Sequence, residues 1–210
     1  MGITERKEKQ KAEIKKQILD ASMKLFVEEG FEHVTIRKIA DLIEYSPTTI
    51  YLYFKDKDEI FFNLHELGFA KFLEMNRNLA DIPNPLLRLH KMGENYIEFG
   101  MSNPEFYDVM FIQKAPMNVL EQMENCNWNH GDAALNALKN LLKDCMDKGF
   151  IKKANPDIVA MAIWSVVHGL VSLSIRERMA KLVNKADLKF TMFQSLNWLL
   201  GVIDISIKKK

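Results

Sequence analysis

The chain has 210 residues, of which 48% are apolar and 27% charged, the composition of an ordinary globular protein. It is long enough to bury a core as one large domain or two small ones. The formal net charge of +1 points to neither a nucleic acid nor a membrane as partner. Only 6 Pro and 9 Gly residues are present, and long stretches free of both favour an all-helical chain.

The charge of the first sixty residues is unevenly distributed. They carry eleven Lys and Arg against twelve Asp and Glu, a net charge of −1. Basic residues dominate only at the start, where residues 1–16 hold six Lys and Arg against three Glu. Such a segment suits contact with phosphates, but it equally suits a solvated helix start, and the sequence leaves both open.

Several features favour a cytoplasmic protein. Cys126 and Cys145 are isolated, as in a reducing compartment, and the N-terminal residues contain no apolar signal-peptide core. The run from Ile158 to Ile175 is a marginal candidate for a membrane span. Because it contains Ser165 and His168 and Arg176 follows directly, we expect a helix buried in a core and a subunit interface, and no membrane partner.

The first predicted helix extends from about Ile3 to Glu29 and ends at Gly30. Thr35 is suited to cap a short helix over residues 36–43. Ser46 is suited to cap a second short helix over residues 47–54, with Pro47 at its first position, where a missing N–H costs nothing.

Asp56 and Glu59 have the spacing of a capping box, which predicts a long helix over about residues 56–80. Pro83 and Pro85 interrupt the chain after it. Further helices are expected, separated by Pro, Gly and Asn residues, over about residues 86–101, 104–113, 117–147, 156–180 and 187–206.

Two short helices joined by a three-residue turn behind a longer helix are the elements of a helix-turn-helix. The second helix must enter a major groove about 12 Å wide, so its outward face needs small polar or hydroxyl-bearing residues. Residues 46–53 provide such a face, while Ile50 and Phe54, four residues apart, are expected to be buried.

The run TIRKIADLIEYSPTTIYLYFKDKDE, residues 35–59, resembles the DNA-binding segment of the TetR family of bacterial repressors. With the preceding helix, the resemblance covers about residues 10–62. It implies that the helix beginning at Pro47 is the recognition helix and that duplex DNA is the partner. Carried over by position, the implied DNA contacts are Thr35, Arg37, Ser46, Pro47, Thr48, Thr49, Tyr51 and Lys57.

Three positions depart from the family pattern, and at one of them Tyr45 stands in place of a small aliphatic residue. Glu44 stands in the turn where the family commonly has Gly, which predicts a modest backbone strain. Pro47 stands where the family often has Lys or Arg, so a guanine contact from that position is not expected. The resemblance therefore implies docking on DNA but not a particular base sequence.

The second half of the chain contains no catalytic, nucleotide-binding or zinc-binding motif, so no enzyme activity, cofactor or metal is expected. It is rich in Met and aromatic residues, which can line an apolar pocket but are more often plain core. We select as candidate effector contacts Phe69, Phe99, Phe106, Met110, Trp128, Trp164 and His168.

The segment from Trp164 to Gly169 resembles the W-x-x-x-H-G segment of a regulatory domain in one branch of the TetR family. That resemblance implies a small apolar ligand bound beside this helix and a homodimer formed by helices at about 156–180 and 187–206. His168 is either a ligand contact or a core residue. Gly169 is expected to permit close helix packing, since Gly costs about 1 kcal/mol in a helix.

The sequence thus predicts an all-α protein of about nine helices, with a three-helix helix-turn-helix domain over residues 1–55 and a helical effector-binding and dimerisation bundle over residues 56–210. The predicted function is a ligand-responsive transcriptional regulator, a repressor released from a palindromic operator by an apolar effector. A small all-helical enzyme or ligand carrier, and a membrane-associated helical protein, are the alternatives.

Overall fold

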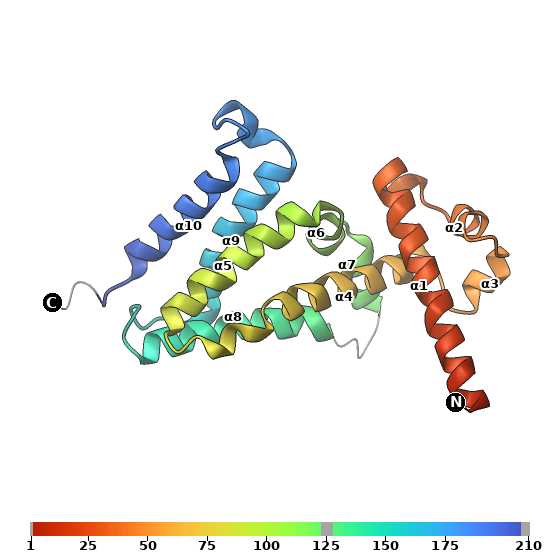
Figure 1. Ribbon diagram of the computed structural model, residues 1–210, viewed down its shortest axis with the longest axis horizontal. Coiled ribbons are helices and arrows are strands. Elements are labelled where there is room, and N and C mark those ends of the chain that lie inside the picture. Colours follow the sequence, from red (N-terminus) through yellow and green to blue (C-terminus); the bar gives the residue numbers. More distant parts are fainter. Residues whose placement is uncertain (1, 123–127, 207–210) are drawn as a thin grey trace. The chain divides into compact units, whose positions relative to one another are not determined.

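The structure is a computed structural model that describes residues 2–122 and 128–206. Helix follows helix within these ranges and no strand occurs in them, which confirms the predicted all-α class (Figure 1). The chain divides into two compact units, residues 1–68 with 105–128 and residues 69–104 with 129–210. The domain division at residues 1–55 and 56–210 stays a prediction.

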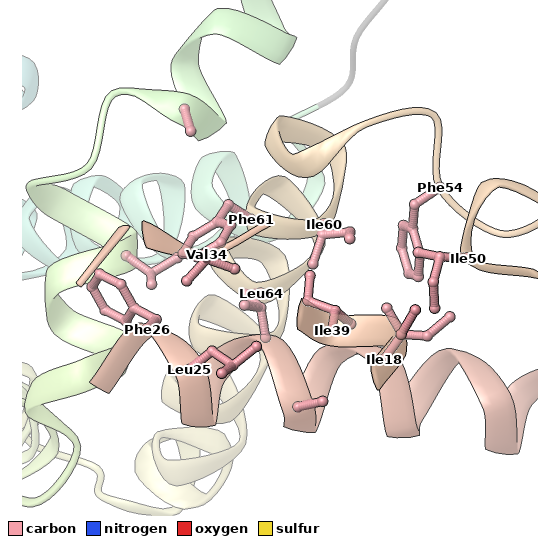
Figure 2. Close-up of a cluster of buried hydrophobic side chains, with 14 of the residues drawn as sticks. Ile18, Leu25, Phe26, Val34, Ile39, Ile50, Phe54, Ile60, Phe61 and Leu64 are labelled. Atoms are coloured by element: carbon pink, nitrogen blue, oxygen red, sulfur yellow. The ribbon is translucent and has the colours of Figure 1, made fainter. Parts of the chain in front are cut away.

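The first unit contains the predicted helix-turn-helix together with the helices that precede and follow it. Its elements are α1 (Ile3–Glu29), a 3-10 turn (Phe31–His33), α2 (Ile36–Leu42), α3 (Pro47–Tyr51), the first part of α4 (Lys57–Met75), α6 (Pro104–Phe111) and α7 (Ala115–Gln122). Figure 2 shows its core, where Ile18 and Leu25 of α1 lie with Ile39 of α2, Ile50 of α3 and Phe61 of α4. Apolar side chains thus form the core that holds the two short helices, and an ion pair between Lys38 and Glu29 also joins α2 to α1.

The first helix has the predicted bounds, whereas the recognition helix is shorter than predicted. It ends at Tyr51 rather than near Phe54. The amides of Leu52 and Tyr53 bond three residues back, to Thr49 O at 3.2 Å and Ile50 O at 2.9 Å. Such tightening is common at helix ends, and Phe54, just beyond it, is buried in the core.

The second unit is built around α5 (Pro85–Ser102), which packs against α8 (Asn129–Asp147), α9 (Pro156–Ile175) and α10 (Leu188–Ile203). An ion pair between Arg88 and Asp144 joins α5 to α8. A Cβ added at Gly93 of α5 would lie 2.8 Å from Leu196 Cδ2 of α10. The glycine therefore permits a close approach of these two helices.

Other predicted helices also end earlier in the structure than the sequence analysis expected. The helix expected over 56–80 ends at Met75 and is followed by a 3-10 segment, Arg77–Asp81. The helix expected over 156–180 ends at Ile175, because Glu177 has the left-handed φ of 55°, which a helix cannot include. A second 3-10 segment, Arg178–Lys181, follows it, and the last helix covers 188–203 within the predicted 187–206.

The single helix expected over 117–147 is two helices, α7 and α8. The described residue Trp128 lies outside both of them, and residues 123–127 of the prediction lie outside the described residues. Asn129, which directly follows Trp128, is the first residue of α8. Asn has low helix propensity and prefers caps and turns, which accounts for a break that the apolar periodicity did not reveal.

Candidate functional site

Both short helices begin at the predicted caps. The Thr35 hydroxyl accepts a hydrogen bond from the Lys38 amide at 3.2 Å, and the Ser46 hydroxyl accepts one from the Thr49 amide at 3.2 Å. Pro47 occupies the first turn of α3, as predicted. These bonds satisfy amides that have no partner within the helix, so they fix where α2 and α3 start.

The turn between α2 and α3 contains the non-glycine residue that the sequence analysis singled out. Glu44 has a φ of 59°, in the left-handed region, and its side chain is exposed. The next amide, that of Tyr45, bonds to Ala40 O at 2.9 Å and closes the turn. Glu44 thus adopts the left-handed conformation that only Gly adopts at no cost, and the expected strain stays a prediction.

Most predicted DNA contacts lie on the surface of this motif. The exposed residues among them are Thr35, Arg37, Ser46, Pro47, Thr48 and Tyr51. Thr49 is half-buried, and its hydroxyl lies 3.0 Å from that of Ser46. Ile50, between Thr49 and Tyr51, is fully buried and Tyr51 is 56% exposed. The helix is thus held from one side and presents hydroxyl groups on the other.

Lys57 differs from the other predicted DNA contacts because its charge is engaged inside the unit. Its ammonium donates a hydrogen bond to Phe31 O at 3.0 Å and lies 3.9 Å from the centroid of the Phe31 ring. A cation over an aromatic ring is itself a stabilising arrangement. Lys57 therefore holds the start of α4 against the 3-10 turn that follows α1, and its contact with phosphate stays a prediction.

The predicted effector contacts divide between the two units, and each group is described within its own unit. Phe106, Met110 and Trp128 belong to the first. A Cβ added at Gly68 of α4 would lie 2.5 Å from Met110 Sδ and 3.2 Å from Phe106 Cδ1, so α4 and α6 approach closely there. Buried His65 stacks on Trp128 with ring centroids 5.8 Å apart.

The pKa of His65 reflects this apolar setting. Burial lowers it from 6.5 to about 4, because the charged imidazolium loses its hydration. Phe62 stacks on the same ring with centroids 6.1 Å apart. His65 is therefore neutral at pH 7.

The second group of predicted effector contacts comprises Phe69, Phe99, Trp164 and His168. Trp164 Nε1 donates to the Tyr96 hydroxyl at 3.1 Å, and that hydroxyl lies 3.2 Å from His168 Nδ1. Burial, and secondarily the charge of Arg176, lowers the pKa of His168. Neutral His168 can therefore accept a hydrogen bond from the Tyr96 hydroxyl at Nδ1, with its own ring proton on Nε2.

Tyr96 is a residue that the sequence analysis missed. Its ring also packs edge-on against Phe72 of α4, with centroids 5.7 Å apart. A signal for it exists, since Leu89, Met92 and Tyr96 recur on one helical face and are all buried. A buried tyrosine hydroxyl requires a partner, but the sequence does not identify which histidine or tryptophan, some seventy residues away, supplies it.

The last two long helices leave apolar side chains exposed. On α9 they are Ile158, Met161, Val166 and Leu173, and on α10 they are Phe190, Trp198 and Val202. A Cβ added at Gly169 of α9 or Gly201 of α10 would meet no atom within 4 Å. The close packing expected at Gly169 is therefore not made within this chain, because the residue faces open space.

Among the described residues, α9 is the one helix whose length and apolar composition would allow it to cross a membrane. One side of it is nevertheless packed in the second unit through Ala160, Ile163, Val167 and Val171.

The described residues contain no cluster of His, Cys, Asp or Glu that could hold a metal ion. Cys145 is buried, which raises the pKa of its thiol to about 11, while Cys126 lies outside the described residues.

Two protein-family models match the chain. The model described as bacterial regulatory proteins, tetR family, matches residues 18–64, which contain the helix-turn-helix. The model described as the tetracyclin repressor-like C-terminal domain matches residues 89–195, more than half of the chain.

Individual relatives agree with these models. An uncharacterised HTH-type regulator of Haemophilus influenzae is 26% identical over 123 residues, which cover 57% of this chain and 66% of that protein. The uncharacterised HTH-type regulator YhgD of Bacillus subtilis is 25% identical over 171 residues, which cover 75% of this chain and 82% of its own. The crystal structure of the transcriptional regulator FadR of Bacillus subtilis with stearoyl-CoA has the same fold, with a TM-score of 0.69, 21% identity, and coverage of 88% of this chain and 96% of that one.

Proposed function

This chain belongs to the TetR family of bacterial regulatory proteins, and we propose that it binds a palindromic DNA site as a homodimer and leaves that site when a small apolar effector binds. Members of this family are ligand-responsive DNA-binding transcriptional regulators, and repression is the output that we propose. The observation that carries the proposal is the capped α2–turn–α3 unit with its exposed hydroxyl face. A regulator acting on bacterial DNA works in the cytoplasm, and we propose no catalytic activity for it.

The proposed contacts with DNA are of two kinds. Ser46, Pro47 and Thr48 stand at the exposed start of α3 and approach base edges, while the hydroxyl of Tyr51 donates to phosphate. Thr35, Arg37 and Thr49 flank them as further phosphate contacts. Lys57 joins this set only if its bond to Phe31 O is exchanged for one to phosphate.

The proposed dimer is formed by the exposed apolar faces of α9 and α10. A single short recognition helix reads too few base pairs for a unique site, so two copies about 34–36 Å apart are required. Trp198 and Ile158, 72% and 68% exposed, are large apolar side chains that a second copy would cover. Gly169 and Gly201, open on the same helices, then allow the two copies to approach closely.

The proposed effector is an apolar molecule that binds in the C-terminal part of the chain. Each unit offers candidate contacts of its own, Phe106, Met110 and Trp128 in the first and Phe69, Phe99, Trp164 and His168 in the second. The FadR neighbour, crystallised with stearoyl-CoA, makes acyl chains the first class to test. We propose that the effector acts through α4, whose residue Phe72 packs on Tyr96, the hydrogen-bond partner of Trp164. An effector changes DNA affinity only if it prefers one of two conformations.

The decisive experiment is selection of DNA by the full chain from a pool of random duplexes, followed by binding measurements with fatty acids and acyl-CoAs of increasing length. Enrichment of an inverted repeat supports DNA recognition, and Thr48→Ala and Tyr51→Phe should then weaken binding. If no sequence is enriched, the DNA-binding proposal fails. If a repeat is enriched but no acyl compound changes the affinity, the acyl-effector proposal alone fails.

A further inference from the structure

The N-terminal part of α1 is a long helical extension with no core of its own. Ile14 is the first residue of α1 described as buried, and residues 4–13 are all exposed. At 1.5 Å per residue they form about 15 Å of helix. A helix that is polar all round gains little from packing, so its length and composition require another explanation.

The start of α1, residues 2–17, which comprises this extension and the following turn from Ile14 to Gln17, holds the positive charge of the DNA-binding part of the chain. It carries six Lys and Arg against three Glu, a net charge of +3, whereas residues 18–60 carry five against nine, a net charge of −4. Without the extension, the helix-turn-helix would repel the phosphates that it has to approach. Electrostatic attraction to DNA therefore depends on α1 more than on α2 and α3.

Several of the positive charges are engaged by partners within the chain and are not available to DNA. Lys38 pairs with Glu29, Lys16 pairs with Asp20, and Lys57 bonds to Phe31 O. By contrast, among the residues that the structure describes, Arg6 and Lys9 make no ion pair or side-chain hydrogen bond. Their charges are therefore available to a partner.

Arg6 and Lys9 also lie along one groove of about 440 Å³ that reaches the helix-turn-helix. It is lined by Arg6, Lys9, Gln10, Glu13, Ile14 and Gln17 of α1 and by Tyr45. Tyr45 directly precedes Ser46, the N-cap of the recognition helix, so the groove borders the residues proposed to approach bases. Guanidinium, ammonium, amide and phenol groups are all donors to phosphate oxygens.

One group in the groove opposes this interpretation. Glu13 contributes a carboxylate, which repels phosphate. The groove nevertheless carries two cations, Arg6 and Lys9, against this one anion.

We propose that this groove is a second DNA-contacting surface, in which Arg6, Lys9 and Tyr45 bind the phosphate backbone beside the base pairs that α3 reads. The inference rests on the proposed DNA-binding function and assigns to this groove most of the electrostatic attraction between the protein and DNA. The occupant is duplex DNA, chosen because the positive charge of the groove matches the one polyanion that α3 would bring next to it.

The test measures the affinity of the full chain for its selected duplex and for an unrelated duplex over a range of salt concentrations. Arg6→Gln with Lys9→Gln should lower the steepness of the salt dependence by about 0.9 for each phosphate that is no longer neutralised, or about 3.6 for a dimer. It should weaken binding to both duplexes by the same factor, because bonds to phosphate carry no sequence information. Thr48→Ala, in contrast, should weaken binding to the selected duplex only.

The matched control is Lys7→Gln with Lys11→Gln, which removes the same charge from the same extension outside the groove. All four positions are exposed, so the thermal midpoint should stay at the wild-type value in both variants. Glu13→Gln should strengthen binding to both duplexes. Equal effects of the two double variants, or no effect of Arg6→Gln with Lys9→Gln, overturn the groove proposal. Failure of the wild-type chain to bind any duplex overturns the proposed function itself.

Discussion

The helix-turn-helix and the bundle around α5 are both helical, yet their stabilising interactions act over different distances along the chain. Around the turn, Thr35 bonds to the amide of Lys38 and Ser46 to that of Thr49, each three residues away. In the bundle, Tyr96 bonds to His168, 72 residues away. A substitution in the motif should therefore have a small, local effect, whereas one in the bundle should change packing between distant helices or between copies.

The largest effect should come from Gly169→Leu on α9. Leu is a better helix former than Gly, and an added Cβ at this position meets no atom within 4 Å, so one chain should fold normally. In a dimer built on this face, the side chain would separate the two copies. We expect a monomer by analytical ultracentrifugation and about a 100-fold or greater loss of affinity for the selected duplex.

Gly93→Leu is the contrasting variant within the same bundle. Its Cβ would lie 2.8 Å from Leu196 Cδ2, and Leu196 is fully buried. Overpacking of this kind costs about 1–3 kcal/mol, so this variant should unfold at a lower temperature, whereas Gly169→Leu should not. A dimeric Gly169→Leu protein that binds DNA normally would contradict the proposed interface.

The next largest effect is the pH dependence of stability, to which buried His65 of the first unit and half-buried His168 of the second should contribute differently. The pKa of His65 is lowered to about 4 by burial, so the folded protein keeps it neutral while the unfolded chain takes up a proton below about pH 6.5. Stability should therefore fall as the pH decreases from 6.5 toward 4, by about 3 kcal/mol in full. Urea unfolding at a series of pH values measures this slope.

His65→Leu should flatten the slope between pH 5 and 7, where most carboxylates do not titrate. His168→Asn should flatten it less, since His168 is only half-buried and its pKa is lowered less strongly. Replacement of exposed His33 serves as the control. An equal slope in wild-type and His65→Leu proteins would show that the His65 ring is hydrated in solution.

The same contrast explains which features the sequence predicted. The caps at Thr35 and Ser46, the turn at Glu44 and the bounds of α1 were predicted because each depends on residues close in sequence. Lys57 is a partial exception, since its partner Phe31 is 26 residues away and engages a charge that the resemblance had assigned to phosphate. The fold class followed from the scarcity of Pro and Gly and from the cap and break residues along the chain.

Features that depend on distant partners were not predicted. Nothing near Tyr96 in the sequence indicates Trp164 or His168 as its partners. The open position of Gly169 could not be foreseen either, because a helical glycine suits close packing within a chain and between chains equally well. The break at Trp128 was missed because the apolar periodicity continues across it.

Ser46→Ala tests the local side of the comparison. It removes the hydroxyl that accepts the Thr49 amide at the start of α3, and loss of such a cap costs about 1 kcal/mol. Chemical unfolding should detect this decrease. Ser46→Gly should cost only a few tenths of a kcal/mol, so equal losses in the two variants would show that the hydroxyl does not act as a cap.

The smallest effect should come from the left-handed turn residue. Glu44→Gly relieves about 1–2 kcal/mol of backbone strain but gives the unfolded chain more freedom, which offsets about 0.4–1 kcal/mol. A net gain of up to about 1.6 kcal/mol in unfolding free energy, with a midpoint of about 0.8 kcal/mol, follows from these two terms. Glu44→Asn should gain less, and Glu44→Ala should gain nothing, because it keeps the Cβ that causes the strain. Glu44→Gln retains the backbone cost and removes the charge, so it should match wild type in stability. If Ala stabilised the chain as much as Gly, the cost at this turn would lie in the carboxylate rather than in the backbone.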